Sequence, residues 1–137
     1  MTNNSKLTPE LLRVCDANLN RLREGLRVVE DILRYKENNK TLASQLKELR
    51  HSVRTDNYHA LLQERDSVND VLKKSTPHEQ QRDSLEAIIV SNFKRAQESA
   101  RVLEELFKLE DTAQSEHFKK IRYTLYALEK EILLSTS

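Results

Sequence analysis

The stretches NLNRLREGLRVVEDILR (residues 18–34) and NFKRAQESARVLEELFK (residues 92–108) carry the same pattern, 74 residues apart. In both stretches apolar residues recur at intervals of three and four, which is the spacing of an amphipathic α-helix. The segments that follow also match, since LKELRHSV (46–53) corresponds to FKKIRYTL (118–125). The chain therefore contains two copies of a helix pair, and the short connections make each pair an antiparallel hairpin.

Two hairpins with one apolar stripe on each helix can bury these stripes against each other. The sequence therefore predicts an all-α protein, a four-helix bundle built from a duplicated antiparallel helical hairpin with a short helix and loop inserted between the hairpins. We expect the hairpins to be related by a pseudo-twofold axis within a single domain, residues 1–137. The predicted parts are a hairpin over 8–53, an insert over 54–75 and a hairpin over 76–134. The predicted main helices lie near 9–36, 41–53, 77–109 and 113–133.

Both hairpins begin with a helix start signal. Thr8 precedes a proline, and Thr76 precedes a proline and is followed three residues later by Glu79, as in a capping box. We therefore expect the third main helix to begin at residue 77. In the insert we expect a short helix near 57–64 and then an irregular loop. This insert should be the most mobile part of the chain and should cover one mouth of the functional site.

The composition narrows the class of protein. The chain has 137 residues with one Gly and two Pro, so a fold with many strands and turns is excluded. The net charge of +1 and the absence of Trp argue against a nucleic-acid-binding surface. No apolar run is long enough to span a bilayer and the N-terminus lacks the apolar core of a signal peptide, so we expect a cytoplasmic protein without a membrane partner. The lone Cys15 lies on an apolar stripe and is predicted to be a buried hydrophobe.

Polar residues are repeated more faithfully than apolar ones in the long helices. A bundle held only by packing should show the opposite, because folding depends on the apolar pattern. Five of the six identical positions are polar, and the identical pairs are Asn18/Asn92, Arg21/Arg95, Glu24/Glu98, Arg27/Arg101, Val28/Val102 and Glu30/Glu104.

Two interpretations of these repeated residues remain open. In an antiparallel hairpin Arg27 should come level with Arg50, and Arg101 level with Arg122, so several guanidinium groups could converge on a carboxylate or phosphate. Alternatively, pairs such as Arg21–Glu24 and Arg27–Asp31 form an ordinary ladder of helical ion pairs. The candidate ligand-binding residues of the first interpretation are Asn18, Arg21, Glu24, Arg27, Arg50, Asn92, Arg95, Glu98, Arg101 and Arg122.

Other site motifs are weak. Glu48 and His51 make half of a di-iron carboxylate pattern, but the second half is missing, so no metal site is predicted from motifs alone. With Gly25 as the only glycine there is no phosphate-binding glycine loop, and a nucleotide would be held by side chains and helix N-termini. Gly25 itself indicates either a close approach of two helices or room for a ligand.

Four ordered blocks resemble a known family: DANLNRLREGLRVVED (16–31), LKELRH (46–51), SNFKRAQESARVLEELFKLE (91–110) and RYTLYALEK (122–130). They are similar to the helical domain found at the N-terminus of some bacterial thiamine-phosphate synthases, which also occurs alone. That family is identified as an alternative hydroxymethylpyrimidine-phosphate kinase. The resemblance implies a role in thiamine biosynthesis, a small phosphorylated pyrimidine as substrate, and ATP with Mg²⁺ as cofactors.

The resemblance also extends to the insert, where it implies roles for Arg65, Asp66 and Asp70. Arg65 joins the candidate phosphate-binding residues, and Asp66 and Asp70 become the candidate catalytic residues, which would hold the metal or position the nucleophilic oxygen. Asn18 and Asn92 would bond the pyrimidine edge. The chain departs from the family at Leu72 and Lys73, where Gly and Thr are expected, and a glycine there would let the backbone approach a phosphate.

Two hypotheses compete with a kinase. One is a non-catalytic helical module that binds a thiamine precursor or docks on thiamine-phosphate synthase. The other is a helical protein in which the Arg/Glu ladder forms only a homodimer interface. The position of the repeated Arg side chains decides between them, since they would face a cavity, a subunit contact or open water.

Overall fold

The computed structural model describes residues 6–135, and within that range its regular elements are all helices. The two ends of the predicted domain, residues 1–5 and 136–137, lie outside the described residues. The prediction of an all-α protein is confirmed. In chain order the elements are α1 (Pro9–Asp31), the π-helix η1 (Ile32–Lys36), α2 (Lys40–Ser52), α3 (Tyr58–Gln63), α4 (Leu85–Phe107) and α5 (Thr112–Ser135).

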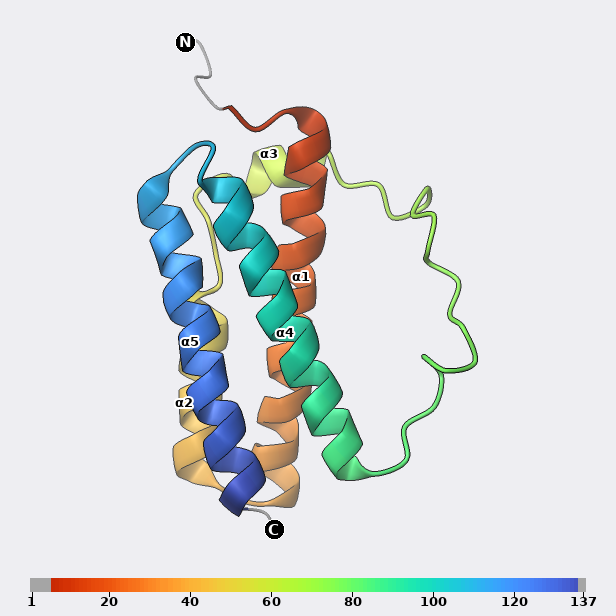
Figure 1. Ribbon diagram of the computed structural model, residues 1–137, viewed down its shortest axis with the longest axis vertical. Coiled ribbons are helices and arrows are strands. Elements are labelled where there is room, and N and C mark those ends of the chain that lie inside the picture. The colour runs from red at the N-terminus through yellow and green to blue at the C-terminus, as the bar shows by residue number, and fades with distance from the viewer. Residues whose placement is uncertain (1–5, 136–137) are drawn as a thin grey trace.

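The four long helices lie side by side along the long axis of the molecule, and neighbours run in opposite directions (Figure 1). α1 packs on α4, α2 packs on α1, and α5 packs on α4. The short helix α3 lies beside the start of α1, and a long loop then runs down the outside of the bundle to the start of α4 (Figure 1). None of the helices formed by residues 6–135 is both long enough and apolar enough to cross a membrane.

Side-chain caps define where the helices begin. The Thr8 hydroxyl accepts a hydrogen bond from the Leu11 amide at 3.2 Å, as its position before Pro9 predicts. Asn39 caps α2 in the same way, and the preceding Asn38 has a φ of 53°, a left-handed conformation that asparagine tolerates. η1 and this turn take up the two residues by which the first hairpin connection exceeds the second.

The predicted start of the third main helix at residue 77 is wrong, because α4 begins at Leu85 with Ser84 as its cap. Thr76 and Glu79 do make the contacts of a capping box, since the Glu79 amide donates to the Thr76 hydroxyl at 3.3 Å and the Glu79 carboxylate lies near the Thr76 amide. Residues 77–84 (PHEQQRDS) contain no large apolar side chain, so no burial against the bundle stabilises a helix there. The non-helical part of the insert therefore extends to residue 84.

The contact between α1 and α4 depends on a small residue. A Cβ atom added at Gly25 would lie 3.0 Å from the backbone oxygen of Asn92, which is tighter than ordinary van der Waals contact. Close helix approach is therefore the interpretation of Gly25 that the structure supports.

The same antiparallel register places Ser99, the counterpart of Gly25, level with Asn18. Asn18 and Asn92 each donate their side-chain amide to the carbonyl four residues earlier, at 2.9 Å.

Each hairpin is closed by one buried ion pair, and the two pairs occupy duplicated positions. Arg50 of α2 donates to Glu30 of α1 at 2.7 Å. In the second hairpin Arg122 of α5 donates to Glu104 of α4 at 2.9 Å. Glu30 is 1% exposed and Glu104 is 5% exposed, so these carboxylates are held in the interior by their arginine partners.

Cys15 lies in the core with 0% exposure, as the sequence predicted. Burial raises the pKa of its thiol to about 11, and the nearby charge of Glu110 adds to the effect. The thiol therefore stays protonated at neutral pH and behaves as a small apolar side chain.

We predict that Glu104→Gln lowers the free energy of unfolding by about 3 kcal/mol, because it leaves the buried Arg122 without its counter-charge. The measurement is chemical denaturation followed by circular dichroism. Glu105→Gln is the matched control, since Glu105 is an exposed neighbour that pairs with Lys108 and Arg101. It should change stability by less than about 0.5 kcal/mol. Equal losses in the two variants would contradict a structural role for the buried pair.

Candidate functional site

A cavity of about 580 Å³ lies between the first half of α1 and the beginning of the loop that follows α3. We call it the α1–insert cavity. Its volume lies within the usual range of small-molecule sites. It brings together five residues that the sequence had singled out, namely Asn18, Arg21, Arg65, Asp66 and Asp70. Asn18 is buried, and Arg21, Arg65 and Asp70 are exposed.

The insert is fastened to α1 by a bidentate ion pair. Arg65 Nε donates to Asp16 Oδ2 at 2.7 Å, and Arg65 Nη2 donates to Asp16 Oδ1 at 2.8 Å. Asp16 is only 6% exposed, and its hydrogen bond and charge raise the pKa of Arg65. The sequence analysis did not assign Asp16. The feature of the sequence that could have identified Asp16 is its position next to Cys15, at the border of the apolar stripe. A carboxylate at such a position needs a partner.

Asp66 is held in the wall of the cavity by its backbone and by its side chain. Arg13 Nη2 donates to the Asp66 carbonyl oxygen at 2.9 Å. The Asp66 carboxylate accepts the side-chain amide of Asn69 at 2.7 Å and the backbone amide of Asn69 at 3.1 Å. These hydrogen bonds, with a smaller effect of the Arg13 charge, lower the pKa of Asp66. Such a carboxylate is a weak base, and it is suited to hold a cation or to orient a hydroxyl group.

Leu72 and Lys73, which stand where the resemblance predicts Gly and Thr, lie in the loop that follows α3. The backbone amide of Leu72 donates to the Asp70 carboxylate at 2.9 Å, and the side chain of Leu72 is 82% exposed. The Lys73 ammonium donates to the Val68 carbonyl at 2.7 Å. The groups that stand in place of the expected Gly and Thr are therefore bonded within the loop.

The Arg side chains of the α1–insert cavity differ in whether a carboxylate neutralises their charge. Arg65 is neutralised by Asp16, whereas Arg21 forms no ion pair with any residue of the described range 6–135. Arg21 therefore has its donors free for an anion such as a phosphate. Asp66 and Asp70 are carboxylates on the same cavity, but within the described part of the chain no three Asp, Glu, His or Cys residues gather in a metal-binding group.

The other predicted residues of the first hairpin lie away from this cavity. Arg27 donates to Asp31 at 3.1 Å, which is the helical pair expected from the sequence. The sequence placed Arg27 level with Arg50, but Arg50 pairs with Glu30, almost one helical turn further along α1. Glu24 is exposed on α1.

In the second hairpin the repeated residues form a separate cavity of about 420 Å³ on α4 and α5, which includes Glu98, Arg101 and Arg122. Arg122 donates to Glu104 and to the Tyr126 hydroxyl. Arg101 lies 3.3 Å from the Glu105 carboxylate. These guanidinium groups therefore already have partners. Asn92 and Arg95 do not line this cavity.

The two hairpins therefore line their cavities with different residues. Asp66 and Asp70 come from the insert between the hairpins, which is not part of the duplicated pattern. Beside α1, one cavity is lined by Arg21 without an ion pair, by the buried Asn18 and by four carboxylates, which are those of Glu10, Asp16, Asp66 and Asp70.

Comparison with known proteins assigns the chain to a family. The ThiD2 family model matches residues 13–131. The chain belongs to the ThiD2 family. The resemblance inferred from the four sequence blocks is therefore confirmed. No solved structure gives a significant match to this ThiD2 chain.

The curated relatives of this ThiD2 chain include several thiamine-phosphate synthases. That of Thermosynechococcus vestitus is 40% identical over 128 residues, which cover 91% of this chain and 36% of that protein. That of Synechocystis sp. is 42% identical over 125 residues, covering 90% of this chain and 36% of that protein. That of Nostoc sp. is 39% identical over 122 residues, covering 88% and 35% respectively. The chain thus spans little more than a third of the length of these relatives.

We predict that Asp16→Asn increases amide hydrogen exchange across residues 65–70 roughly tenfold, because the variant loses a charge-assisted pair that fastens the loop to α1. Mass-spectrometric hydrogen exchange on the whole chain measures this. Asp31→Asn, which removes an exposed pair on the same helix, is the control and should leave the loop unchanged. If exchange in the loop is the same in both variants, the Asp16–Arg65 pair does not position the insert.

Proposed function

We propose that the protein binds a phosphorylated hydroxymethylpyrimidine in the α1–insert cavity and transfers a phosphoryl group to it from ATP, as a step in thiamine biosynthesis. The observation that carries the proposal is the meeting of Arg21 with Asp66 and Asp70 in one cavity. Membership of the ThiD2 family and the names of the thiamine-phosphate synthase relatives support the pathway.

Arg21 is the residue proposed to bind the phosphate of the substrate. Its donors are free of ion pairs, and a guanidinium can meet two phosphate oxygens at once. Arg65 adds positive charge beside it, although Asp16 already engages two of its donors. Asn18 uses its amide nitrogen for the Val14 carbonyl, so its side-chain oxygen remains as an acceptor for an amino group on the pyrimidine edge.

The acidic residues of the cavity fit the magnesium ion that a kinase requires. Mg²⁺ is usually held by one or two carboxylates together with phosphate oxygens and water, so a cluster of three protein ligands is not needed. Asp66 and Asp70 would hold the ion, and the lowered pKa of Asp66 keeps that carboxylate charged. Magnesium ATP would supply the phosphoryl group, whose charge the Arg side chains help to neutralise.

A second candidate function uses the same cavity without catalysis. In this alternative the chain is a module that binds the thiamine precursor, or docks on thiamine-phosphate synthase, and the reaction occurs elsewhere. One observation favours it, namely that the Leu72 amide is bonded to Asp70 instead of being offered to a phosphate. The relatives are also much longer than this chain.

The binding prediction uses the duplication as its control. Arg21→Gln should weaken the affinity for hydroxymethylpyrimidine phosphate roughly tenfold to a hundredfold, because it removes a charge-assisted hydrogen bond to phosphate. Arg95→Gln changes the matching position of the second copy and should leave the affinity unchanged. Isothermal titration calorimetry measures the affinity, and melting temperatures confirm that both variants are folded. Equal losses in the two variants, or an absence of binding by the unmodified chain, would contradict the proposal.

A turnover assay separates the two candidate functions. We expect the chain to form ADP when hydroxymethylpyrimidine phosphate, ATP and Mg²⁺ are present together. Asp66→Asn should reduce this rate at least about a hundredfold while substrate affinity changes little, since the carboxylate acts on the metal and not on the pyrimidine. Substrate binding without any ADP formation would support the non-catalytic module.

A further inference from the structure

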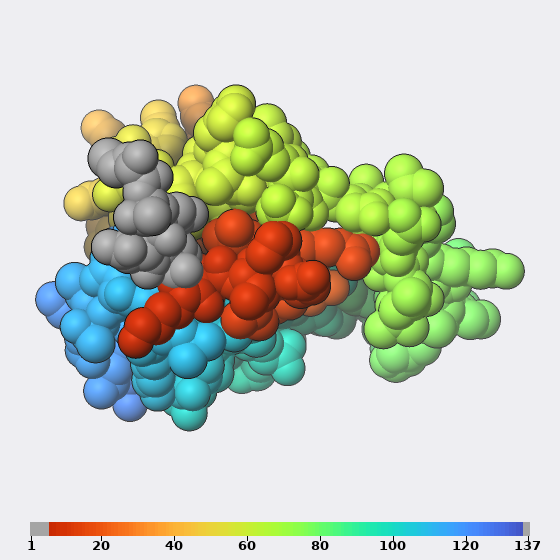
Figure 2. Space-filling view, turned by 90° about the horizontal axis from the view of Figure 1, so that it is seen from above, coloured from red at the N-terminus to blue at the C-terminus, as the bar shows by residue number. Residues whose placement is uncertain are grey.

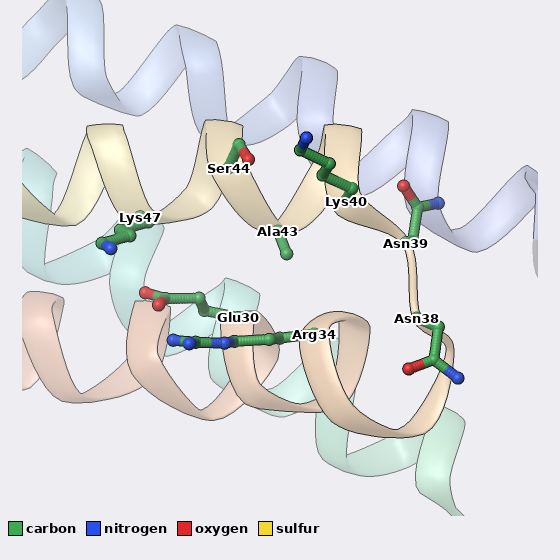
Figure 3. Close-up of a pocket in the computed structure, with 8 residues that line it drawn as sticks. All are labelled: Glu30, Arg34, Asn38, Asn39, Lys40, Ala43, Ser44 and Lys47. Carbon is green, nitrogen blue, oxygen red and sulfur yellow. The ribbon is translucent and has the colours of Figure 1, made fainter.

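A second cavity lies at the other end of α1, where the first hairpin turns. It has a volume of about 340 Å³ and lies between the end of α1 with η1 and the first half of α2. Figure 3 shows Arg34 and Lys47 reaching from the two helices toward the same place beside Glu30. Lys40, in the first turn of α2, also lines the cavity. We call it the hairpin cavity.

The cavity carries uncompensated positive charge. Arg34, Lys40 and Lys47 are exposed, and none of the three forms an ion pair with a residue between 6 and 135. Glu30 is the acidic residue of the lining, and its carboxylate is already bonded to Arg50 at 2.7 Å. Arg34 and Lys47 therefore meet at a cavity whose acidic residue, Glu30, is already bonded to Arg50, while the side chain of Lys40 extends away from them (Figure 3).

The second hairpin provides an internal comparison. Its counterpart of Arg34 is Lys108, which is bonded to Glu105 at 2.7 Å. Its counterpart of Ser44 is Glu116, which places a carboxylate on the helix that corresponds to α2. The second hairpin therefore pairs Lys108 with a carboxylate and carries a further acidic residue at Glu116, whereas the corresponding residues of the first hairpin are the unpaired Arg34 and Ser44.

Arg34 lies in the π-helix, where its guanidinium sits over the Tyr35 ring at 4.9 Å but forms no ion pair with a residue between 6 and 135. The residue that corresponds to Glu105 is Asp31, and it pairs with Arg27. η1 begins directly after Asp31, and a π-helical turn contains more residues than an α-helical turn. Arg34 forms no ion pair with Asp31, whereas Lys108, in the turn that ends α4, lies 2.7 Å from the Glu105 carboxylate.

We propose that the hairpin cavity is a binding site for a diphosphate group. A diphosphate carries about three negative charges at neutral pH, and its oxygens can accept from the Arg34 guanidinium and the Lys47 ammonium together, with the positive charge of Lys40 in the first turn of α2 nearby. The diphosphate can belong to free pyrophosphate or to a nucleoside diphosphate. The site is separate from the α1–insert cavity, and the proposal does not depend on the proposed function.

The test is a titration of the whole isotope-labelled chain with pyrophosphate, followed by amide chemical shifts in two-dimensional NMR. We expect saturable shift changes across residues 38–47. Lys47→Gln should weaken the binding roughly tenfold. Lys119→Gln, the matching change in the second hairpin, and Arg21→Gln in the other cavity should leave it unchanged. A parallel titration with ADP identifies the source of the diphosphate, because a nucleoside diphosphate ligand shifts the same residues at lower concentration.

Three results would overturn the proposal. One is the absence of saturable shifts at millimolar pyrophosphate. Another is an equal effect of Lys47→Gln and Lys119→Gln, which would indicate general attraction to surface charge. The third is a set of shifts confined to residues 13–21 and 65–70, which would place the anion in the α1–insert cavity. Inorganic phosphate that binds as tightly as pyrophosphate would contradict the assignment to a diphosphate.

Discussion

The fold depends on a buried ion pair that is used twice. Glu30 and Glu104 lie almost fully inside the bundle, and each is bonded to an arginine of the following helix. A buried carboxylate without such a partner would be strongly destabilising, so each pair fixes how its two helices align. This constraint explains the repetition of Glu30 as Glu104 and of Arg50 as Arg122. Apolar core residues can exchange volume with their neighbours, whereas a buried charge cannot exchange its partner.

Both cavities described above lie where the two copies differ. The α1–insert cavity is formed by α1 and the insert, a segment outside the duplicated pattern that Asp16 and Arg65 fasten to α1. The hairpin cavity lies where α1 continues into the π-helix η1 and the chain then turns into α2. The duplicated helices form the framework, and both candidate binding cavities lie where the two copies differ. In the second copy the guanidinium groups of Arg101 and Arg122 are bonded to the chain itself.

The sequence predicted most of the framework because helical periodicity and caps are local properties. The helices near 9–36, 41–53 and 113–133 and the short helix of the insert were predicted correctly. The start of α4 was not, because Thr76 and Glu79 form a cap that no apolar residue follows for a full turn. A cap signal shows where a helix can begin, but burial decides whether it continues.

Which of the candidate site residues lie close together could be predicted from the sequence only in part. Periodicity indicates the face of a helix that a residue occupies, but not the turn of the neighbouring helix that it meets. The sequence analysis therefore placed Arg50 level with Arg27, whereas in the structure Arg50 pairs with Glu30. The meeting of Arg21 with Asp66 depends on the path of the insert, which has no periodic pattern.

The most direct test of the account is a crystal structure of the chain with hydroxymethylpyrimidine phosphate. The account predicts one ligand molecule, in the α1–insert cavity with its phosphate on Arg21. A ligand bound at Arg101 and Arg122, or two molecules related by the duplication, would contradict it.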